Sequence, residues 1–414
     1  MIRQIRLIGF LLLMLVLQAV KAGLFAQPQE AVPVTDLKYI NTGFENASPL
    51  YWKITPEGEI DIFLVYDLER ESPNRANGHW FFQVQAKKGS DLTLIMNNFE
   101  NVWNGKKGVP VSDKTMCYIS PDNKQWSVVN TDVLDGNRLQ LKLHMSHESL
   151  YVAHVQPYRI SDLDALLAEI EDHPLVKITG IGKTVEGRQL EIVRIGHANT
   201  PYRILIRARA HSWEPGGNWV VQGLIRNLLR DEETNQRYLD RYALYIMPMA
   251  NKDGVAHGRT RFNIQGKDLN RNWDKPADPY YAPENYALEQ WINSMQNAGK
   301  RLHFAIDLHN DQGGRIHVSR PNIDLNAYLE FIQRYEALMR EHTWFTEGST
   351  GGDFRNPGTI GEGLLERFGI FACVQELNCN WIAGLQKHPF GSDWELLGSQ
   401  MRDVFYHLFE KEKQ

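Results

Sequence analysis

The sequence predicts two domains, an antiparallel β-sandwich followed by a larger α/β domain. Short alternating or apolar runs recur from about residue 58 to residue 156, and turn-forming residues separate them. Beyond Pro157, strand-like runs are interleaved with segments of helical periodicity, which is typical of an α/β fold. At 414 residues the chain is long enough for two domains, each able to bury its own core.

The N-terminal segment has the pattern of a secretory signal peptide. Two arginines precede a 14-residue apolar stretch, 7–20, that a single glutamine interrupts. This length is short for a membrane span and suits the core of a signal peptide. We therefore expect residues 1–26 to be a signal peptide, cleaved after Ala22 or Ala26, and the protein to be secreted or periplasmic. An uncleaved membrane anchor is the alternative.

Residues 37–156 are expected to form the sandwich. The alternating or apolar runs are residues 60–66, 79–84, 92–96, 138–143 and 150–155. Asn, Gly, Asp and Ser turns between them give the rhythm of a β-sandwich. Exposed aromatics on this domain could bind glycan or peptide, although aromatic residues in strands are usually part of the core.

Residues 157–414 are expected to form the α/β domain. Ser161 is a candidate N-cap for a first helix, because apolar residues follow it at helical spacing. Further helical patterns cover about 285–296 and 325–341. The last helix is expected to begin at Ser392, with Glu395 three positions on as a capping box.

Composition excludes several classes of function. Lys and Arg total 45 against 50 Asp and Glu, and the charges form no runs, so neither nucleic acid nor an anionic membrane surface is an expected partner. Beyond the signal or anchor segment no integral membrane domain is expected. Three cysteines are too few for a disulfide framework, although Cys373 and Cys379 could pair after export.

Polar residues gather at the predicted strand ends of the α/β domain. His211 and Glu214 lie on a strand-to-helix turn, where an HxxE motif is more informative than on a solvated helix. His309 ends a second strand-like run, and Glu376 lies near the end of a third. Because ligands bind outside the carboxyl ends of strands in open α/β sheets, these residues can converge on one site. Two imidazoles and a carboxylate are typical of a zinc site with one open position.

The order of motifs around these residues resembles the M14 family of zinc carboxypeptidases. Between the two histidine segments lie Asn-Lys-Asp-Gly at 251–254, Arg-Thr-Arg-Phe-Asn at 259–263 and Gly-Lys-Asp-Leu-Asn-Arg-Asn-Trp at 266–273. The resemblance is strongest to the cytosolic-carboxypeptidase-like branch, whose members carry a β-rich domain ahead of the catalytic one. It implies a mixed-sheet α/β/α catalytic domain, and one zinc ion per chain bound by three ligands. Those ligands would be His211, Glu214 and His309.

The resemblance also implies how a peptide would be bound and cleaved. Glu376 would be the general base for attack by zinc-activated water, and Arg261 would face the scissile carbonyl. Asn270 and Arg271 would bind the terminal carboxylate of a peptide or protein substrate, a role that suits a planar guanidinium. Arg259 could exchange roles with Arg261.

Two positions depart from the pattern of the family. From residue 342 to residue 376 there is no tyrosine to close the site over substrate; Phe354 lies in this stretch, and Tyr280 or Tyr281 could substitute. Relatives that remove glutamate resemble one another in a Gly-Thr-Gly-Arg element. In this chain, spacing places Gly361 at the position of its arginine. We therefore expect no preference for substrates that end in glutamate.

Two other functions remain open from the sequence. A zinc amidohydrolase of the same fold could act on a cell-wall peptide or an N-acyl bond, since such substrates also carry carboxylates. A binding protein on the same scaffold without activity is the other alternative. The presence of all three expected ligands and of the general base favours the carboxypeptidase.

Overall fold

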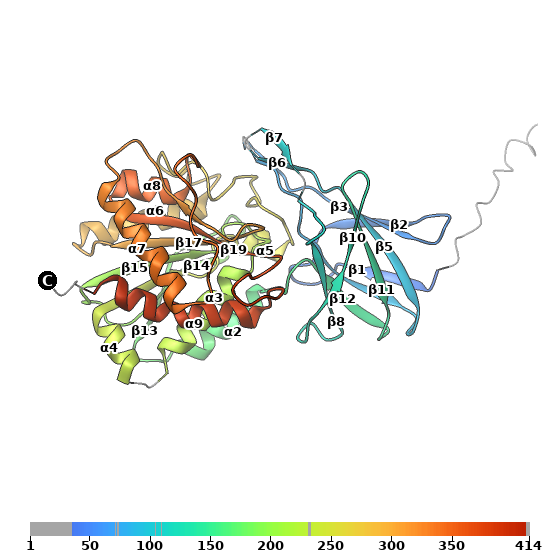
Figure 1. Ribbon diagram of the computed structural model, residues 1–414, viewed down its shortest axis with the longest axis horizontal. Coiled ribbons are helices and arrows are strands. Elements are labelled where there is room, and N and C mark those ends of the chain that lie inside the picture. The colour runs from blue at the N-terminus through green and yellow to red at the C-terminus, as the bar shows by residue number, and fades with distance from the viewer. Residues whose placement is uncertain are drawn as a thin grey trace, which may run out of the picture.

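The computed structural model describes residues 35–410, except residues 71, 73, 104, 109, 231 and 232. Figure 1 shows two bodies side by side, a β-sandwich and a larger α/β domain. The expected signal peptide, 1–26, lies outside the described residues and stays a prediction. Among the helices that the structure describes, none is long and apolar enough to cross a membrane.

Two five-stranded sheets form the sandwich. Their orders are β1-β4-β12-β8-β9 and β10-β11-β5-β3-β2, and a hairpin of β6 and β7 extends from them. The strands are β1 (Leu37–Asn41), β2 (Leu50–Ile54), β3 (Ile60–Leu64), β4 (Phe81–Ala86), β5 (Asp91–Asn97), β6 (Asn101–Trp103), β7 (Lys106–Gly108), β8 (Met116–Ser120), β9 (Ser127–Asn130), β10 (Asp132–Leu134), β11 (Arg138–His144) and β12 (Ser149–Ala153). Their pairing is antiparallel except between β3 and β5, which run parallel. Alternate residues of both sheets fill a shared apolar core.

A seven-stranded mixed sheet forms the centre of the α/β domain. Its order is β13-β14-β16-β15-β17-β19-β18. The strands are β13 (Val176–Lys183), β14 (Gln189–Ile195), β15 (Tyr202–Ala208), β16 (Tyr242–Met247), β17 (Phe304–Asp311), β18 (Ile316–Val318) and β19 (Phe371–Asn378). β16, β15, β17 and β19 are parallel neighbours, and antiparallel strands flank them on both sides. The expected mixed α/β fold is therefore confirmed.

Helices cover both faces of this sheet. Those of the described residues are α2 (Ile160–Ile170), α3 (Gly216–Leu228), α4 (Glu233–Arg241), α5 (Lys252–Ala256), α6 (Pro283–Asn297), α7 (Asn326–His342), α8 (Ile360–Phe368) and α9 (Gly391–Leu408). One apolar core joins the sheet to α2, α3, α4, α7 and α9, and a second joins its other face to α6 and α8. β12 ends before the expected domain boundary near Pro157 and α2 begins after it, but the division itself stays a prediction.

Local details of the helix starts differ from the sequence-based expectation. The first helix is preceded by Arg159 as N-cap, and Asp162 accepts a hydrogen bond from its backbone N–H; Ser161 instead donates to Glu45 of the sandwich. The last helix starts after Phe390, whose backbone N–H donates to Asp393. In both helices an aspartate at the third position provides the cap. Ser161 and Ser392 were therefore wrong as helix starts.

Candidate functional site

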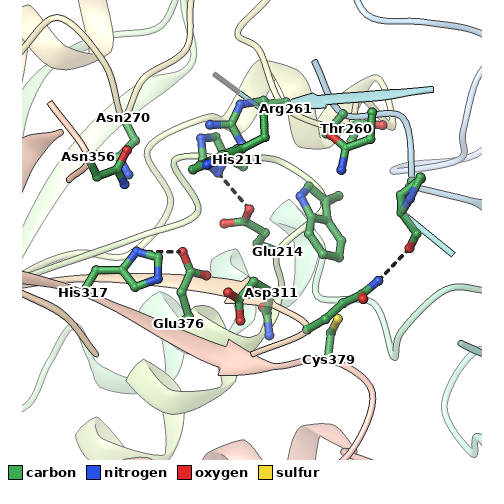
Figure 2. A pocket seen from close by; sticks show the side chains of 18 of the residues that line it. His211, Glu214, Thr260, Arg261, Asn270, Asp311, His317, Asn356, Glu376 and Cys379 are labelled. Atoms are coloured by element: carbon green, nitrogen blue, oxygen red, sulfur yellow. Dashed lines mark hydrogen bonds and ion pairs between the residues drawn. The ribbon is translucent and has the colours of Figure 1, made fainter. Parts of the chain in front are cut away.

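A cavity of about 370 Å³ is lined by residues from both domains (Figure 2). The sandwich contributes Ala76, Gly78, Asn101, Trp103, Pro110 and His154. The α/β domain contributes His211, Trp213, Glu214, Thr260, Arg261, Asn270, Arg271, Asn310, Asp311, Gln312, His317, Phe354, Asn356, Glu376 and Cys379. Most of the residues singled out in the sequence therefore reach one cavity, together with a wall from the other domain.

Three potential metal ligands converge at the base of this cavity. His211 and Glu214 lie on the turn between β15 and α3, as expected, and His309 lies within β17. The Nδ1 atoms of His211 and His309 lie 2.8 and 2.7 Å from the two carboxylate oxygens of Glu214, and 3.1 Å from each other. All three side chains are buried. A buried set of two imidazoles and one carboxylate has the donor chemistry of a zinc site with an open fourth position.

Carboxylates hold the outer nitrogen of each histidine. Nε2 of His211 lies 3.0 Å from Asp268, and Nε2 of His309 lies 2.6 Å from Asp307. Such partners place the proton on Nε2 and leave the Nδ1 lone pair facing the centre, as in many zinc sites. Arg207 in turn donates to both oxygens of Asp307 at 2.7 and 2.6 Å. The residues therefore fit a zinc ion in ligand type and in the support of each ligand.

The charges around these ligands favour an ionised Glu214. Its burial opposes ionisation, but the positive charge of His211 and His309, when they are protonated, outweighs that effect and lowers the pKa of Glu214 to about 2. A carboxylate that stays ionised is available as a metal ligand over the whole physiological pH range.

Glu376 lies beside the potential ligands, on the neighbouring strand. In the parallel pairing of β17 and β19 its Cα is the register partner of His309. Both residues lie within their strands and not at the ends, because β17 and β19 extend to Asp311 and Asn378. Burial and the nearby carboxylate of Asp311 raise the pKa of Glu376 well above its ordinary value. Figure 2 shows its carboxylate pointing toward the cavity that Arg261 borders from the opposite side.

Arg261, Asn270 and Arg271 approach the cavity from one long loop between α5 and α6. The Nε atom of Arg261 donates to Asp268 at 2.8 Å, so this carboxylate links the arginine to His211. Arg271 is almost fully buried and donates from Nη2 to Asn356 at 2.9 Å. Both guanidinium groups lie near the ring of Trp103, at 5.6 and 5.3 Å from its centroid. Arg261 lines the cavity and Arg259 does not, which favours Arg261 as the arginine that faces the scissile carbonyl.

Gly361 is not among the residues that line the cavity, and its part in substrate binding stays a prediction. It lies in the first turn of α8, and a Cβ there would meet Ser319 Oγ at 2.6 Å and the backbone of Cys373. Its side-chain direction therefore faces the sheet interior. Tyr281 lines a different cavity, and Tyr280 is exposed, so neither tyrosine takes the place of Phe354 beside His317.

Several residues of the site were not identified from the sequence. Asp268 lies two positions before Asn270, and Asp307 two positions before His309. That spacing was the only feature of the sequence that could have indicated them. His317 comes from the edge strand β18 and lies 4.0 Å from Glu376. Trp103 belongs to the other domain, and no local pattern connects it to the zinc motifs. Cys373 and Cys379, which could have paired, do not: all three cysteines are buried and free.

A second group of potential ligands shares the cavity, namely Asp311, His317 and Glu376. It is less enclosed than the first, because these three side chains are only partly buried. The first group also has carboxylates behind both histidines, which orients its donors before a metal binds. We therefore place the expected metal at His211, Glu214 and His309.

Comparison with known sequences finds a similarity to zinc carboxypeptidases over part of the chain. The Peptidase_M14 family model matches residues 163–314, which include all three expected ligands but not Glu376. An uncharacterised protein of Zymomonas mobilis is 27% identical over 65% of this chain and 64% of its own length. Cytosolic carboxypeptidase 6 of Caenorhabditis elegans is 27% identical over 48% of this chain and 44% of its own. The matched region of this chain thus spans 64% of the length of the first relative and 44% of the length of the second.

Solved structures share the complete two-domain fold. A metallo-carboxypeptidase from Burkholderia cenocepacia superimposes with a TM-score of 0.77 at 20% identity, over 89% of this chain and 98% of that one. A metallo-carboxypeptidase from Pseudomonas aeruginosa, in complex with (2-guanidinoethylmercapto)succinic acid, gives a TM-score of 0.76 at 20% identity, over 90% and 99% of the chains. At this identity the likeness establishes the fold alone.

Proposed function

Because this chain carries a zinc carboxypeptidase domain of the M14 family, we propose that it is a metallocarboxypeptidase that hydrolyses the C-terminal bond of peptides or proteins. One observation carries the proposal: a cluster of three metal donors, of which His211 and Glu214 line the cavity, lies beside a free carboxylate and two buried arginines of the same cavity. The donors alone would suit many hydrolases. The arginines add what an exopeptidase needs, a means of binding a chain terminus.

The three ligands and Glu376 have separate tasks in the proposed reaction. A zinc ion held by His211, Glu214 and His309 would supply a Lewis acid that activates water, and positive charge that favours the ionised form of Glu376. Glu376 then takes the proton from the attacking water and later delivers it to the leaving amine. Its Oε2 atom has no hydrogen-bond partner, so one carboxylate oxygen is free for that proton.

The two arginines act on different parts of the substrate. Arg261 faces the position of the scissile carbonyl, where a fixed cation stabilises the charge that develops on oxygen in the transition state. Arg271 binds the terminal carboxylate together with the side-chain amide of Asn270, whose carbonyl oxygen already accepts from the backbone of Ile360. Burial lowers the pKa of Arg271, with Asp268 acting in the opposite direction, and a bound carboxylate would offset that burial.

The test compares peptides that differ only at the C-terminus. A peptide with a free carboxylate should be cleaved at its last bond, and the C-terminally amidated copy should be cleaved far more slowly because Arg271 loses its partner. Mass spectrometry of the products reports which bond breaks. Equal rates on both peptides would favour the amidohydrolase, and a zinc content near zero at neutral pH would favour a binding protein.

A further inference from the structure

One carboxylate of the sandwich domain, that of Asp67, binds the backbone of the loop that carries Arg261. Asp67 follows β3, and its side chain accepts hydrogen bonds from three successive backbone N–H groups of the α/β domain. Oδ1 accepts from Thr260 at 3.0 Å, and Oδ2 accepts from Arg261 at 2.6 Å and from Phe262 at 3.0 Å. An ionised acceptor makes stronger hydrogen bonds than a neutral one, and here three of them define the path of one loop.

Asp67 is partly buried at the contact between the two domains. Burial raises the pKa of Asp67, and the three backbone N–H groups act in the opposite direction. Without those donors a carboxylate at this interface would lose part of its solvation, and only the charge of Arg259 would offset the loss. The chain at the next turn is also held across the interface, since the backbone N–H of Arg70 donates to the carbonyl of Gly266 at 2.8 Å.

Arg261 is therefore fixed at two points by different domains. Asp67 holds its backbone, and Asp268 accepts from its Nε atom at 2.8 Å. Asp268 also holds the outer nitrogen of His211, so the position of this loop affects both the arginine and a ligand. A shift of the backbone by about 1 Å would move the guanidinium away from the developing charge, and displacements of that size can cost about 100-fold in rate.

We propose that Asp67 is a positioning residue for Arg261, through which the sandwich domain completes the active site of the α/β domain. This inference rests on the proposed carboxypeptidase function. It gives the sandwich a part in the chemical step, in addition to forming one wall of the cavity. The alternative is that Asp67 merely helps to dock the two domains.

A second carboxylate at the domain interface provides the matched control. Glu45 of the sandwich accepts from the backbone N–H and the hydroxyl of Ser161 at 3.1 and 2.7 Å, at the start of α2. It joins the same two domains but does not touch the loop of Arg261 or line the cavity. If each carboxylate only helps to dock the domains, Glu45→Gln and the equally conservative Asp67→Asn should have similar effects.

The experiment measures steady-state hydrolysis of a free-C-terminus peptide by full-length zinc-loaded protein. Asp67→Ala should lower kcat by about 10- to 100-fold with little change in KM, because an ill-placed Arg261 affects the transition state more than binding. Glu45→Gln should keep the wild-type kcat. Asp67→Asn should be intermediate, since its one carbonyl oxygen can still accept from Arg261 and Phe262. Equal kcat values for Asp67→Ala and wild type would overturn the inference.

A double-mutant cycle separates positioning from a general structural effect. If Asp67 acts through Arg261, then adding Asp67→Ala to Arg261→Ala should cause no further loss of kcat. Fully additive losses would show that Asp67 acts by another route.

Amide hydrogen exchange tests the same contact without any substrate. Exchange at Thr260, Arg261 and Phe262 should become faster in Asp67→Ala and should stay at the wild-type rate in Glu45→Gln. If wild-type protein cleaves no peptide, the proposed function fails while exchange still decides whether Asp67 orders the loop. Unchanged exchange at these three amides contradicts the inference whatever the activity.

Discussion

At the level of single residues, Glu376 is distinguished from the metal ligands by its free oxygen. Its Oε1 atom lies 4.0 Å from His317, and its Oε2 atom has no hydrogen-bond partner. The expected ligands instead face one another, with carboxylates behind both histidines. This difference separates proton transfer from metal binding and can be tested by substitution.

Glu376→Gln should keep its zinc and lose most of its activity. The amide has nearly the same shape but cannot take a proton from water, and general-base catalysis is worth about 100- to 10,000-fold in rate. We expect kcat to fall within that range, while zinc content by atomic emission stays near one ion per chain. A variant that loses the metal, or that keeps substantial activity, would contradict the assignment.

Arg271→Ala should mainly impair recognition of the substrate terminus. It leaves a carboxylate in the cavity without its charged partner, at a cost of about 2 to 5 kcal/mol in kcat/KM. The amidated form of the same peptide carries no terminal charge, so its slow hydrolysis should hardly change. Arg259→Ala is the matched control, because that arginine does not line the cavity. A similar loss on both peptides would rule out the carboxylate-binding role.

How far the site could be predicted depends on where each residue lies in the sequence. His211 and Glu214 were recognisable because a short turn places them three positions apart, and His309 because an apolar strand leads into it. Asp67 and Trp103 reach the site from a different domain, and only the folded chain brings them there. Spacing along the chain does not give the direction of a Cβ, and at Gly361 that direction points to Ser319 and Cys373.

At the level of elements, the parallel core of the α/β sheet was predictable, and the short strands of the sandwich and its hairpin were not. The runs leading to residues 208, 308 and 375 are mostly apolar, as expected for strands that are largely buried on both faces. The short strands β6, β7 and β10 have only three residues each, too few to establish an alternating pattern. Likewise, the parallel pairing of β3 with β5 depends on contacts across the sheet, which no local pattern encodes.

The crossing of α3 and α9 depends on two glycines that face the opposite helix. A Cβ at Gly398 would overlap the carbonyl oxygen of Val220, and a Cβ at Gly223 would overlap that of Glu395. Gly398→Ala should therefore destabilise the protein by about 1 to 3 kcal/mol through overpacking, which outweighs the gain of about 1 kcal/mol in helix propensity. Urea unfolding measures the change.

The neighbouring substitution Ser399→Ala provides the control for that prediction. It gives α9 a similar increase in helix propensity, but removes only a local hydrogen bond to the carbonyl of Leu396. If Gly398→Ala proves as stable as wild type, the two helices can separate at little cost and the close crossing is not required.

At the level of the whole molecule, a stack of aromatic rings connects the sandwich core to the metal-binding turn. The ring of His154 lies 4.2 Å from that of Trp80 in the sandwich and 5.4 Å from that of Trp213, between His211 and Glu214 in the sequence. His79 lies nearby and contacts the carbonyl of Asn46 through Nε2. The two domains therefore share two buried histidines, which makes their association sensitive to pH.

Stability should fall as the pH drops below about 6.5, because both histidines are buried. Burial lowers the pKa of His79 to about 3; the hydrogen bond to the carbonyl of Asn46 opposes this shift, and the charge of Arg209 adds to it. Burial likewise lowers the pKa of His154 to about 4. In the unfolded chain each pKa returns to about 6.5, so between these values the unfolded state binds more protons. The free energy of unfolding contributed by each histidine is thus complete above pH 6.5 and lost as the pH falls toward its folded pKa.

The size of this effect gives a measurable difference in slope. One buried histidine contributes up to about 1.4 kcal/mol per pH unit, so at pH 5.5 the pair should cost about 3 kcal/mol relative to neutral pH. His154→Phe keeps a ring between Trp80 and Trp213 but removes one titrating group, and should reduce the slope between pH 6.5 and 5 by about one proton. Urea unfolding at several pH values measures this, with the exposed His147→Phe as control. Contributions from carboxylates and metal ligands are common to all three proteins, so an unchanged slope in His154→Phe would show that the folded protein protonates His154 without unfolding.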